Sequence, residues 1–489
     1  MDVQQLDTWI REGRSRLARR VLEQHFRENG FARLSRPLRL ELARIARRAG
    51  LPLAAVRLLH SVVRPGPRVL RVATPAEQSE YAASLAQIGA DAEALKILDS
   101  LDSAGNPEIL LFRAFARFPR WDYSAAIPLL ERYLAVQNEP YPRLVGLINL
   151  AAALVAIDAA ERAIPLLEAL IEEASKGGHQ LLVGNALLLK AEALVEREQW
   201  REAARLLKAA AEHSKEVASL DALYVDKWSA ILRLKETGGS KEALLAVDRV
   251  RRRAAEARNG ETLRDLDFHQ AVVTNDGRLF ARAYWGTPYP EYRRRLEKFP
   301  LRAQLPQRPS WVSGTSMRPA EIDFFEGGLK PGQLLWRLSG CLVSDAYRSF
   351  RLAAIHAALF PERHFHPLHS PNVVHQAVRR LRQHLAAQNT PLSLREESGS
   401  YRLFCRRSAR LFLPRDSSAT PARLQLDRFL MGRKRGPFGR RELELALGLS
   451  ERAAAYLLSE AVAKGWVVAE GGGRARTYRA AEQKSLSRS

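Results

Sequence analysis

The chain has 489 residues, with 77 Lys or Arg against 54 Asp or Glu, so its formal net charge is +23. This length predicts more than one domain. No run of 18 apolar residues is present, and the first residues lack a secretory pattern, so we expect no membrane span and a cytoplasmic, nucleoid-associated protein. The two cysteines, Cys341 and Cys405, have no neighbours at metal-ligand spacing, which favours reduced, structural thiols.

The positive charge is unevenly distributed along the chain. Residues 1–70 carry +9, residues 71–240 carry −6, residues 241–370 carry +7, and residues 371–489 carry +13. More than half of the excess therefore lies in the last quarter. This asymmetry is typical of an appended region that binds nucleic acid, and a uniform arginine bias would not leave an acidic segment in the middle.

A repeat occupies the first 260 residues. The hexapeptide AIPLLE begins at Ala126 and again at Ala163. Looser copies place further anchor alanines at Ala18, Ala55, Ala94, Ala203 and Ala243. Twelve residues before five of these seven anchors stands another alanine, at Ala43, Ala82, Ala114, Ala151 and Ala191. Small residues on both helices of a hairpin allow close backbone approach, and two helices of about 14 residues fill this period, so we predict a helical solenoid.

The repeat resembles tetratricopeptide repeats. The best copy, NALLLKAEALVEREQWREAARLLKAAAEH, matches that motif at Leu187, Ala191, Leu194, Ala203, Leu207 and Ala210. The resemblance covers roughly Asp2 to Asn259 and implies a mainly α-helical domain, which one or two further predicted helices extend to residues 1–299. It also implies a concave surface that binds a protein, a peptide or a small effector. The alternative is an array that only holds chains together.

We interpret the proline-, serine- and glycine-rich residues 300–320 as a linker. A first winged helix-turn-helix is predicted over residues 321–413, beginning with a short strand and two helices. The segment SPNVVHQAVRRLRQHL, from Ser370, follows with apolar residues at helical spacing and forms the third helix. Leu392, Leu394, Tyr401 and Leu403 then alternate around Ser398-Gly399-Ser400, which predicts a β-hairpin, or wing.

This segment resembles the OmpR-type winged helix of bacterial response regulators, because VRRLRQHL and GSYRL match its third helix and its wing. The resemblance implies that the third helix enters the major groove of double-stranded DNA. The candidate residues for base contacts are Asn372, His375, Gln376 and Arg379. The candidates for phosphate contacts are Arg380, Arg382, Arg395 and Arg402.

The alternative for this unit is a protein-docking role, which winged helices also serve. Four histidines crowd the region, at His364, His366, His369 and His375. No carboxylate or thiol joins them at a supporting spacing, so we expect no metal site.

A second winged helix-turn-helix is predicted over residues 421–480. Its third helix begins after Ser450, a natural N-cap, and Gly-Gly-Gly-Arg forms the tip of its wing. The candidate DNA-binding residues are Arg452, Tyr456, Arg474 and Arg476, with the arginines of the wing suited to phosphate or minor-groove contacts. The alternative is a dimerisation module. Residues 481–489 are expected to be a disordered tail.

No phosphate loop, zinc-protease helix or nucleophile elbow is present, so we expect no enzyme, no catalytic residue and no cofactor. The sequence favours a bacterial transcription regulator, in which a helical-repeat sensor or scaffold precedes tandem DNA-binding units and the chain is a possible homodimer. The alternative is an assembly scaffold. It would resemble PCI proteins, whose helical repeats run into a winged helix used for protein–protein contacts.

Overall fold

The computed structural model describes residues 2–31, 34–65, 72–214, 220–314, 320–322, 329, 332–413, 426, 429–430, 433, 436–472 and 476–481. Within these residues, no helix is both long enough and apolar enough to cross a bilayer. The predicted tail at residues 481–489 lies outside them except for its first residue.

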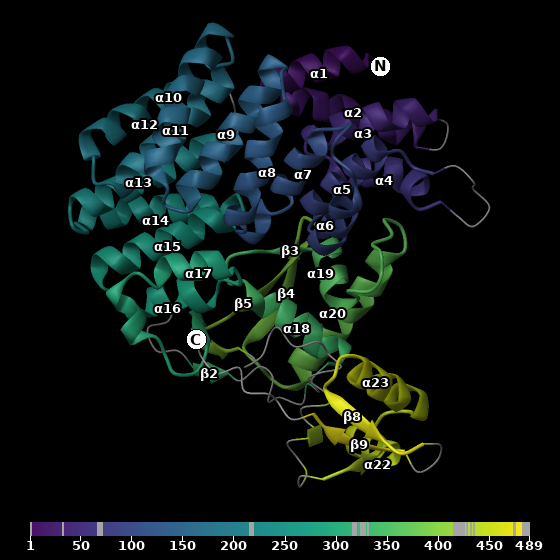
Figure 1. Ribbon diagram of the computed structural model, residues 1–489. Helices are drawn as coiled ribbons and strands as arrows, with labels where there is room; N and C mark the ends of the chain where they lie inside the picture. The colour runs from purple at the N-terminus through teal and green to yellow at the C-terminus, as the bar shows by residue number, and fades with distance from the viewer. Residues whose placement is uncertain are drawn as a thin grey trace.

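Helices arranged as successive hairpins form a curved array over the first 296 residues (Figure 1). The helices are α1 Val3–Arg11, α2 Ser15–Asn29, α3 Arg36–Arg48, α4 Pro52–Val63, α5 Pro75–Ile88, α6 Asp91–Ser100, α7 Glu108–Phe115, α8 Tyr123–Val136, α9 Pro140–Ala156, α10 Ala160–Lys176, α11 Gln180–Glu196, α12 Trp200–Ser214, α13 Leu220–Glu236, α14 Lys241–Glu256, α15 Gly260–Thr274, α16 Gly277–Trp285 and α17 Pro290–Leu296. A short 3-10 helix, η1, spans Phe118–Arg120.

The anchor alanines explain how the hairpins pack. All seven lie on the even-numbered helices α2 to α14, and each is fully buried. The five alanines twelve residues earlier are buried on the odd-numbered helices α3 to α11. A methyl group at each crossing allows the two helices to approach closely, so the predicted helical array is confirmed.

Side-chain caps define where several helices begin. Thr74 accepts a hydrogen bond from the backbone N–H of Glu77, and the Glu77 carboxylate accepts from the backbone N–H of Thr74. Ser240 and Asn259 cap α14 and α15 with one bond each, accepting from the backbone N–H groups of Ala243 and Thr262. These side chains satisfy backbone donors that have no helical acceptor.

The segment predicted to be a linker contains ordered structure. Residues Pro300–Gln304 form a second 3-10 helix, η2, and Ser310–Ser313 form strand β1. β1 pairs antiparallel with β6, Ala409–Phe412, and β2, Ala320–Ile322, pairs parallel with β6 on its other side. Pairing with β6 satisfies the backbone of residues 310–313, so this part of the segment is held as a strand.

The first C-terminal unit, residues 332–413, follows with α18 Leu334–Ser344, β3 Phe350–Arg351, α19 Leu352–Leu359 and α20 Ser370–Ala387. The predicted hairpin is present as β4 Leu392–Glu397 and β5 Ser400–Cys405, and the sheet order is β3-β5-β4. Its four alternating apolar residues all face inward and are buried.

The second C-terminal unit, residues 436–481, contains β7 Phe438–Gly439, α22 Arg440–Leu447, α23 Glu451–Ala463, β8 Val467–Glu470 and β9 Thr477–Ala480. Its sheet has the order β7-β9-β8. The Ser450 hydroxyl accepts a hydrogen bond from the backbone N–H of Ala453, as its predicted N-cap role requires. Leu443, Leu457, Leu458 and Tyr478 belong to a core that this unit does not share with the array.

The first C-terminal unit lies on the open side of the curved array (Figure 1). One continuous apolar core joins array residues such as Leu266 with Tyr347, Phe350 and Leu381 of this unit. A second core joins the first repeats with Ala353 and Phe365. The first C-terminal unit is therefore built into the array.

Candidate nucleic-acid interface

Helix α20 has one apolar face and one polar face. Val374, Ala377, Val378, Leu381 and Leu385 are buried against the rest of the unit, as their spacing predicts. Pro371 lies in the first turn, where its missing N–H has no helical acceptor. Burial of the apolar stripe fixes which side of α20 faces outward.

The outward side of α20 carries the polar candidate residues. Asn372, His375, Gln376, Arg379 and Arg380 are all exposed. Residues 363–395 contain five arginines and no Asp or Glu. The exposed face of α20 is thus free of acidic side chains from its own segment, which suits approach to a phosphate backbone.

Two other candidate arginines are exposed but positioned by contacts within the unit. Nε of Arg382 donates to the carbonyl oxygen of Leu394, at 3.0 Å, and so ties α20 to β4. The guanidinium of Arg395 lies over the Phe404 ring, 3.5 Å from its centroid. Both arginines keep solvent access at the edge of the hairpin.

Arg402 lies elsewhere than the resemblance implies. Its guanidinium donates to the carbonyl oxygen of Ala346, at 2.9 Å, and faces the interior. Burial lowers the pKa of Arg402, and the positive charge of Arg282 lowers it further. Because β5 turns this side of the hairpin toward the array, the observed contact does not support the expected phosphate contact of Arg402, which stays a prediction.

The tip of the hairpin is also turned toward the array. Ser398, Gly399 and Ser400 line a groove between the array and the first C-terminal unit. Arg258, at the turn between α14 and α15, donates to the carbonyl oxygen of Glu397 at 2.7 Å. The wing therefore contacts protein, and α20 is left as the exposed nucleic-acid candidate of this unit.

The segment that leads into α20 is attached to the first repeats. Phe365 is buried in the core of those repeats, and its backbone N–H donates to the Glu93 carboxylate at 2.9 Å. Nδ1 of His366 accepts hydrogen bonds from the backbone N–H groups of Leu368 and His369. These bonds require an unprotonated Nδ1, so they fix the charge state of His366 at the start of the helix.

A histidine of the array completes this attachment. The ring of His60, on α4, lies 4.4 Å from the ring of His366, and its Nδ1 lies 3.0 Å from the hydroxyl of Tyr81. Burial lowers the pKa of His60 to about 4, together with the repulsion that a protonated His366 would exert and the positive charge of Arg64. The His60–His366 contact is thus made between neutral rings at neutral pH.

The candidate DNA-binding residues of the second C-terminal unit lie in different surroundings. Arg452 and Tyr456 lie on the exposed face of α23 and line a cavity of about 640 Å³. The same cavity is also lined by Phe360 and Arg363 of the first unit, although Tyr456 keeps 70% of its surface exposed. Arg476 is exposed, with its guanidinium 5.8 Å from the centroid of Tyr478. Arg474 lies outside the described residues.

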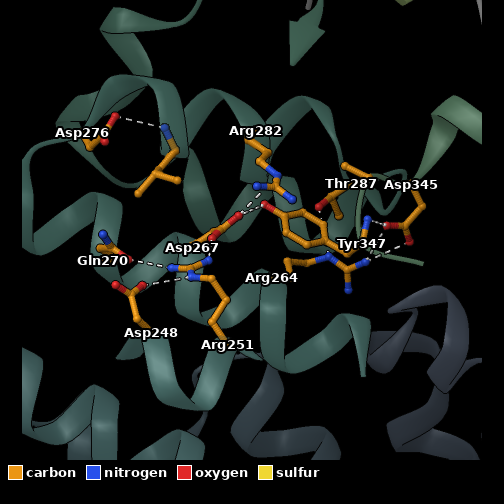
Figure 2. Close-up of polar contacts among 12 residues, drawn as sticks. Asp248, Arg251, Arg264, Asp267, Gln270, Asp276, Arg282, Thr287, Asp345 and Tyr347 are labelled. Carbon is orange, nitrogen blue, oxygen red and sulfur yellow. Dashed lines mark hydrogen bonds and ion pairs between the residues drawn. The ribbon is translucent and has the colours of Figure 1, made fainter. Parts of the chain in front are cut away.

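A buried ion pair holds the first C-terminal unit to the end of the array (Figure 2). Arg264 of α15 donates to both carboxylate oxygens of Asp345, at 3.1 and 2.9 Å, and to the hydroxyl of Thr287. Asp345 also accepts from the hydroxyl of Tyr289 and from the backbone N–H of Tyr347. Burial by itself would lower the pKa of Arg264, but the Asp345 carboxylate raises it above its ordinary value.

A second contact lies beside the first (Figure 2). The Tyr347 hydroxyl donates to the Asp267 carboxylate at 2.9 Å. Arg251 also donates to Asp267 and, at 2.6 Å, to Gln270, while Arg282 lies 3.4 Å from Asp267. Buried charges that are paired with opposite charges and hydrogen-bonded favour one arrangement of the two parts.

Sequence reasoning missed this junction. Its only trace is the segment RDLDFH, Arg264–His269, where charged and apolar residues occupy every side of α15 and are all buried. An amphipathic pattern is lost when a helix is buried on all sides, and the sequence does not show which distant residues supply the partners.

Among the described residues, no group of three or more His, Cys, Asp or Glu side chains is arranged to hold a metal ion. Cys341 and Cys405 are unpaired, and burial raises the pKa of both thiols. A raised pKa keeps these thiols protonated and makes them poor nucleophiles.

No protein-family model and no curated protein matches this chain. Among solved structures, a Rap protein complexed with competence and sporulation factor has a TM-score of 0.43 at 13% identity, over 79% of this chain and 97% of that chain. The apo form of RapI gives 0.36 at 12% identity, over 58% and 84%. Aspartyl phosphate phosphatase F from Bacillus subtilis gives 0.37 at 13% identity, over 62% and 90%. These similarities are distant, and the array is established by its own helices.

Proposed function

We propose that this protein is a DNA-binding regulator without catalytic activity, in which the exposed face of α20 reads the major groove of double-stranded DNA. The helical array serves as the platform for a protein, peptide or small effector. The second C-terminal unit adds cationic side chains such as Arg476 beside the same DNA.

The observation that carries this proposal is the exposed, acid-free polar face of α20. Its amide and guanidinium groups suit the donor and acceptor patterns of base edges, and Arg379 has the fork geometry that fits guanine. The positive charge of the last 119 residues, +13, favours association with a polyanion. A surface used only for protein contact needs neither property.

An assembly scaffold is the second candidate function. The observation in its favour is the continuous core that joins the array to Tyr347, Phe350 and Leu381 of the first C-terminal unit. A unit built into a helical array is suited to rigid protein–protein contact. The inward wing, with Arg402 turned to the interior, favours the same role.

The test uses the full chain, because the first C-terminal unit shares its core with the array. Random-sequence duplexes are selected for binding over several rounds, and the enriched sequence is titrated with salt. The proposal expects a defined motif whose affinity falls with a log–log slope of about −0.9 per phosphate contact.

Two matched variants separate base reading from general charge. Arg379→Ala should cost about 1–3 kcal/mol on the selected motif and much less on unrelated duplexes. Arg132→Ala removes an exposed arginine of α8 and should leave both affinities unchanged. If no motif is enriched and both variants bind equally weakly, the DNA-binding proposal is wrong and the scaffold remains.

A further inference from the structure

The groove between the array and the first C-terminal unit has a volume of about 1080 Å³. Its walls come from well-separated parts of the chain, including the start of α4, η1, the turn before α15 and residues 345–353. The wing tip, residues 398–400, and the segment that leads into α20 also line it. Residues of both the array and the first C-terminal unit therefore line this groove.

The lining is rich in arginine and poor in acid. Six arginines line the groove, against the two carboxylates of Glu261 and Asp345. Three of these arginines have ion-pair partners, namely Arg19 with Glu23, Arg258 with Glu397 and Arg264 with Asp345.

The other three arginines, Arg57, Arg348 and Arg351, have no carboxylate within ion-pair distance among the described residues. Arg57 extends from α4 and is exposed. Arg348 reaches from the first C-terminal unit to the turn after α5, where a Cβ on Gly89 would lie 3.2 Å from its Nη2. Arg351 donates to the carbonyl oxygen of Gln87 at 2.9 Å.

Two carboxylates, Asp91 and Asp345, raise the pKa of Arg348 against the effect of burial, although neither forms an ion pair with it among the described residues. Asp345 is already occupied by other donors. Both oxygens of Asp345 accept from Arg264, and Tyr289 and Tyr347 donate to them as well. Burial lowers the pKa of Arg351, and the positive charge of Arg348 lowers it further. Like charges partly removed from water and held near each other are stabilised by an anion placed against them.

We propose that this groove binds a small organic anion with more than one phosphate or carboxylate group. Its anionic groups contact Arg57 of the array and Arg348 and Arg351 of the first C-terminal unit. Guanidinium forks match the geometry of phosphate and carboxylate oxygens, and Trp121, Tyr123 and Tyr289 supply apolar surface for the body of the ligand.

A compact ligand fits this groove better than an extended chain. The wing tip and Pro367 and Pro371 line the groove opposite the array, so the first C-terminal unit occupies the concave side along which a long peptide would run. Because the ligand contacts both parts of the molecule, its binding stabilises their junction. The inference concerns anion binding alone and does not depend on the DNA-binding proposal.

Isothermal titration calorimetry on the full chain tests this inference, with four probes used in separate titrations. Inorganic triphosphate and citrate represent phosphate and carboxylate sources, adenosine is the uncharged control, and hexaglutamate represents an acidic peptide. We expect binding of triphosphate or citrate at one site per chain, weakened by added salt, and no binding of adenosine.

Two substitutions test whether the anion binds in this groove. Arg57→Gln removes an exposed arginine that has no ion-pair partner in the described part of the chain, so the protein should fold normally and bind the anion at least tenfold more weakly. Arg132→Gln, the matched control on α8, should bind like the unchanged chain and thereby measure non-specific attraction to the basic surface. Equal binding by both variants, binding of hexaglutamate alone, or no binding of triphosphate and citrate would each overturn the inference.

Discussion

The first C-terminal unit shares its apolar core with the array, whereas the second C-terminal unit has a core of its own. Both units place a helix before a two-stranded hairpin, at α20 and α23. The outward face of α20 is exposed and, among the described residues, lines no cavity shared with the second unit, while Arg452 and Tyr456 on α23, which are also exposed, line a cavity together with residues of the first unit. Similar local elements therefore acquire different roles from the surfaces that surround them.

The hairpins differ in the same way. The wing of the first unit lines the groove beside the array, and Arg258 holds its strand end. In the second unit, Arg476, which precedes β9, and Arg479 of β9 remain exposed. Burial of a polar surface depends on what the rest of the chain places against it, so the basic character of a hairpin does not by itself identify a DNA contact.

The largest effect is expected at the buried junction. Arg264→Ala leaves the Asp345 carboxylate buried without its ion partner and should lower the free energy of unfolding by about 3–5 kcal/mol. Glu451→Ala removes an exposed ion pair with Arg440 in the second unit and should cost less than about 1 kcal/mol. Chemical denaturation of the two variants measures the contrast, and equal losses would refute it.

A smaller effect is expected from acid at the attachment of α20. The pKa of His60 falls from an ordinary 6.5 to about 4 on folding, so the unfolded chain takes up a proton first as the pH is lowered. Stability from this group is present above pH 6.5 and is lost progressively toward pH 4. The loss should be on the order of 1–3 kcal/mol.

The measurement compares denaturation midpoints of the unchanged chain and His60→Gln at pH 7 and pH 5. The variant should lose less stability than the unchanged chain over this interval, because glutamine does not titrate. Parallel pH profiles would show that the His60–His366 contact has no part in the acid response.

The smallest effect is expected at the cap of α23. Ser450→Ala removes the hydroxyl that accepts from Ala453 N–H and should destabilise the second unit by about 1 kcal/mol. Ser459→Ala changes an exposed serine inside the same helix and should be neutral or slightly stabilising. Amide hydrogen exchange in α23 reports both changes. Faster exchange only in Ser459→Ala would show that Ser450 does not stabilise the start of α23.

The array was predictable from sequence because its signal is local and repeated. Each anchor alanine is fully buried at a helix crossing, and the same spacing recurs along the chain. The apolar stripe of α20 and the alternation of Leu392, Leu394, Tyr401 and Leu403 identified a helix and a hairpin for the same reason. Periods of 3.6 and 2 residues follow directly from backbone geometry.

Long-range contacts decided what those elements do. The sequence around Arg402 does not tell whether its guanidinium contacts a phosphate or, as observed, the carbonyl oxygen of Ala346. The bonds of Arg264 to Asp345, of Arg258 to Glu397 and of Arg351 to Gln87 join residues that are 81, 139 and 264 positions apart. The sequence by itself thus determined which segments are helices and strands, through local periodicity. Only the tertiary structure decided which charged side chains remain exposed, because burial is set by contacts between distant segments.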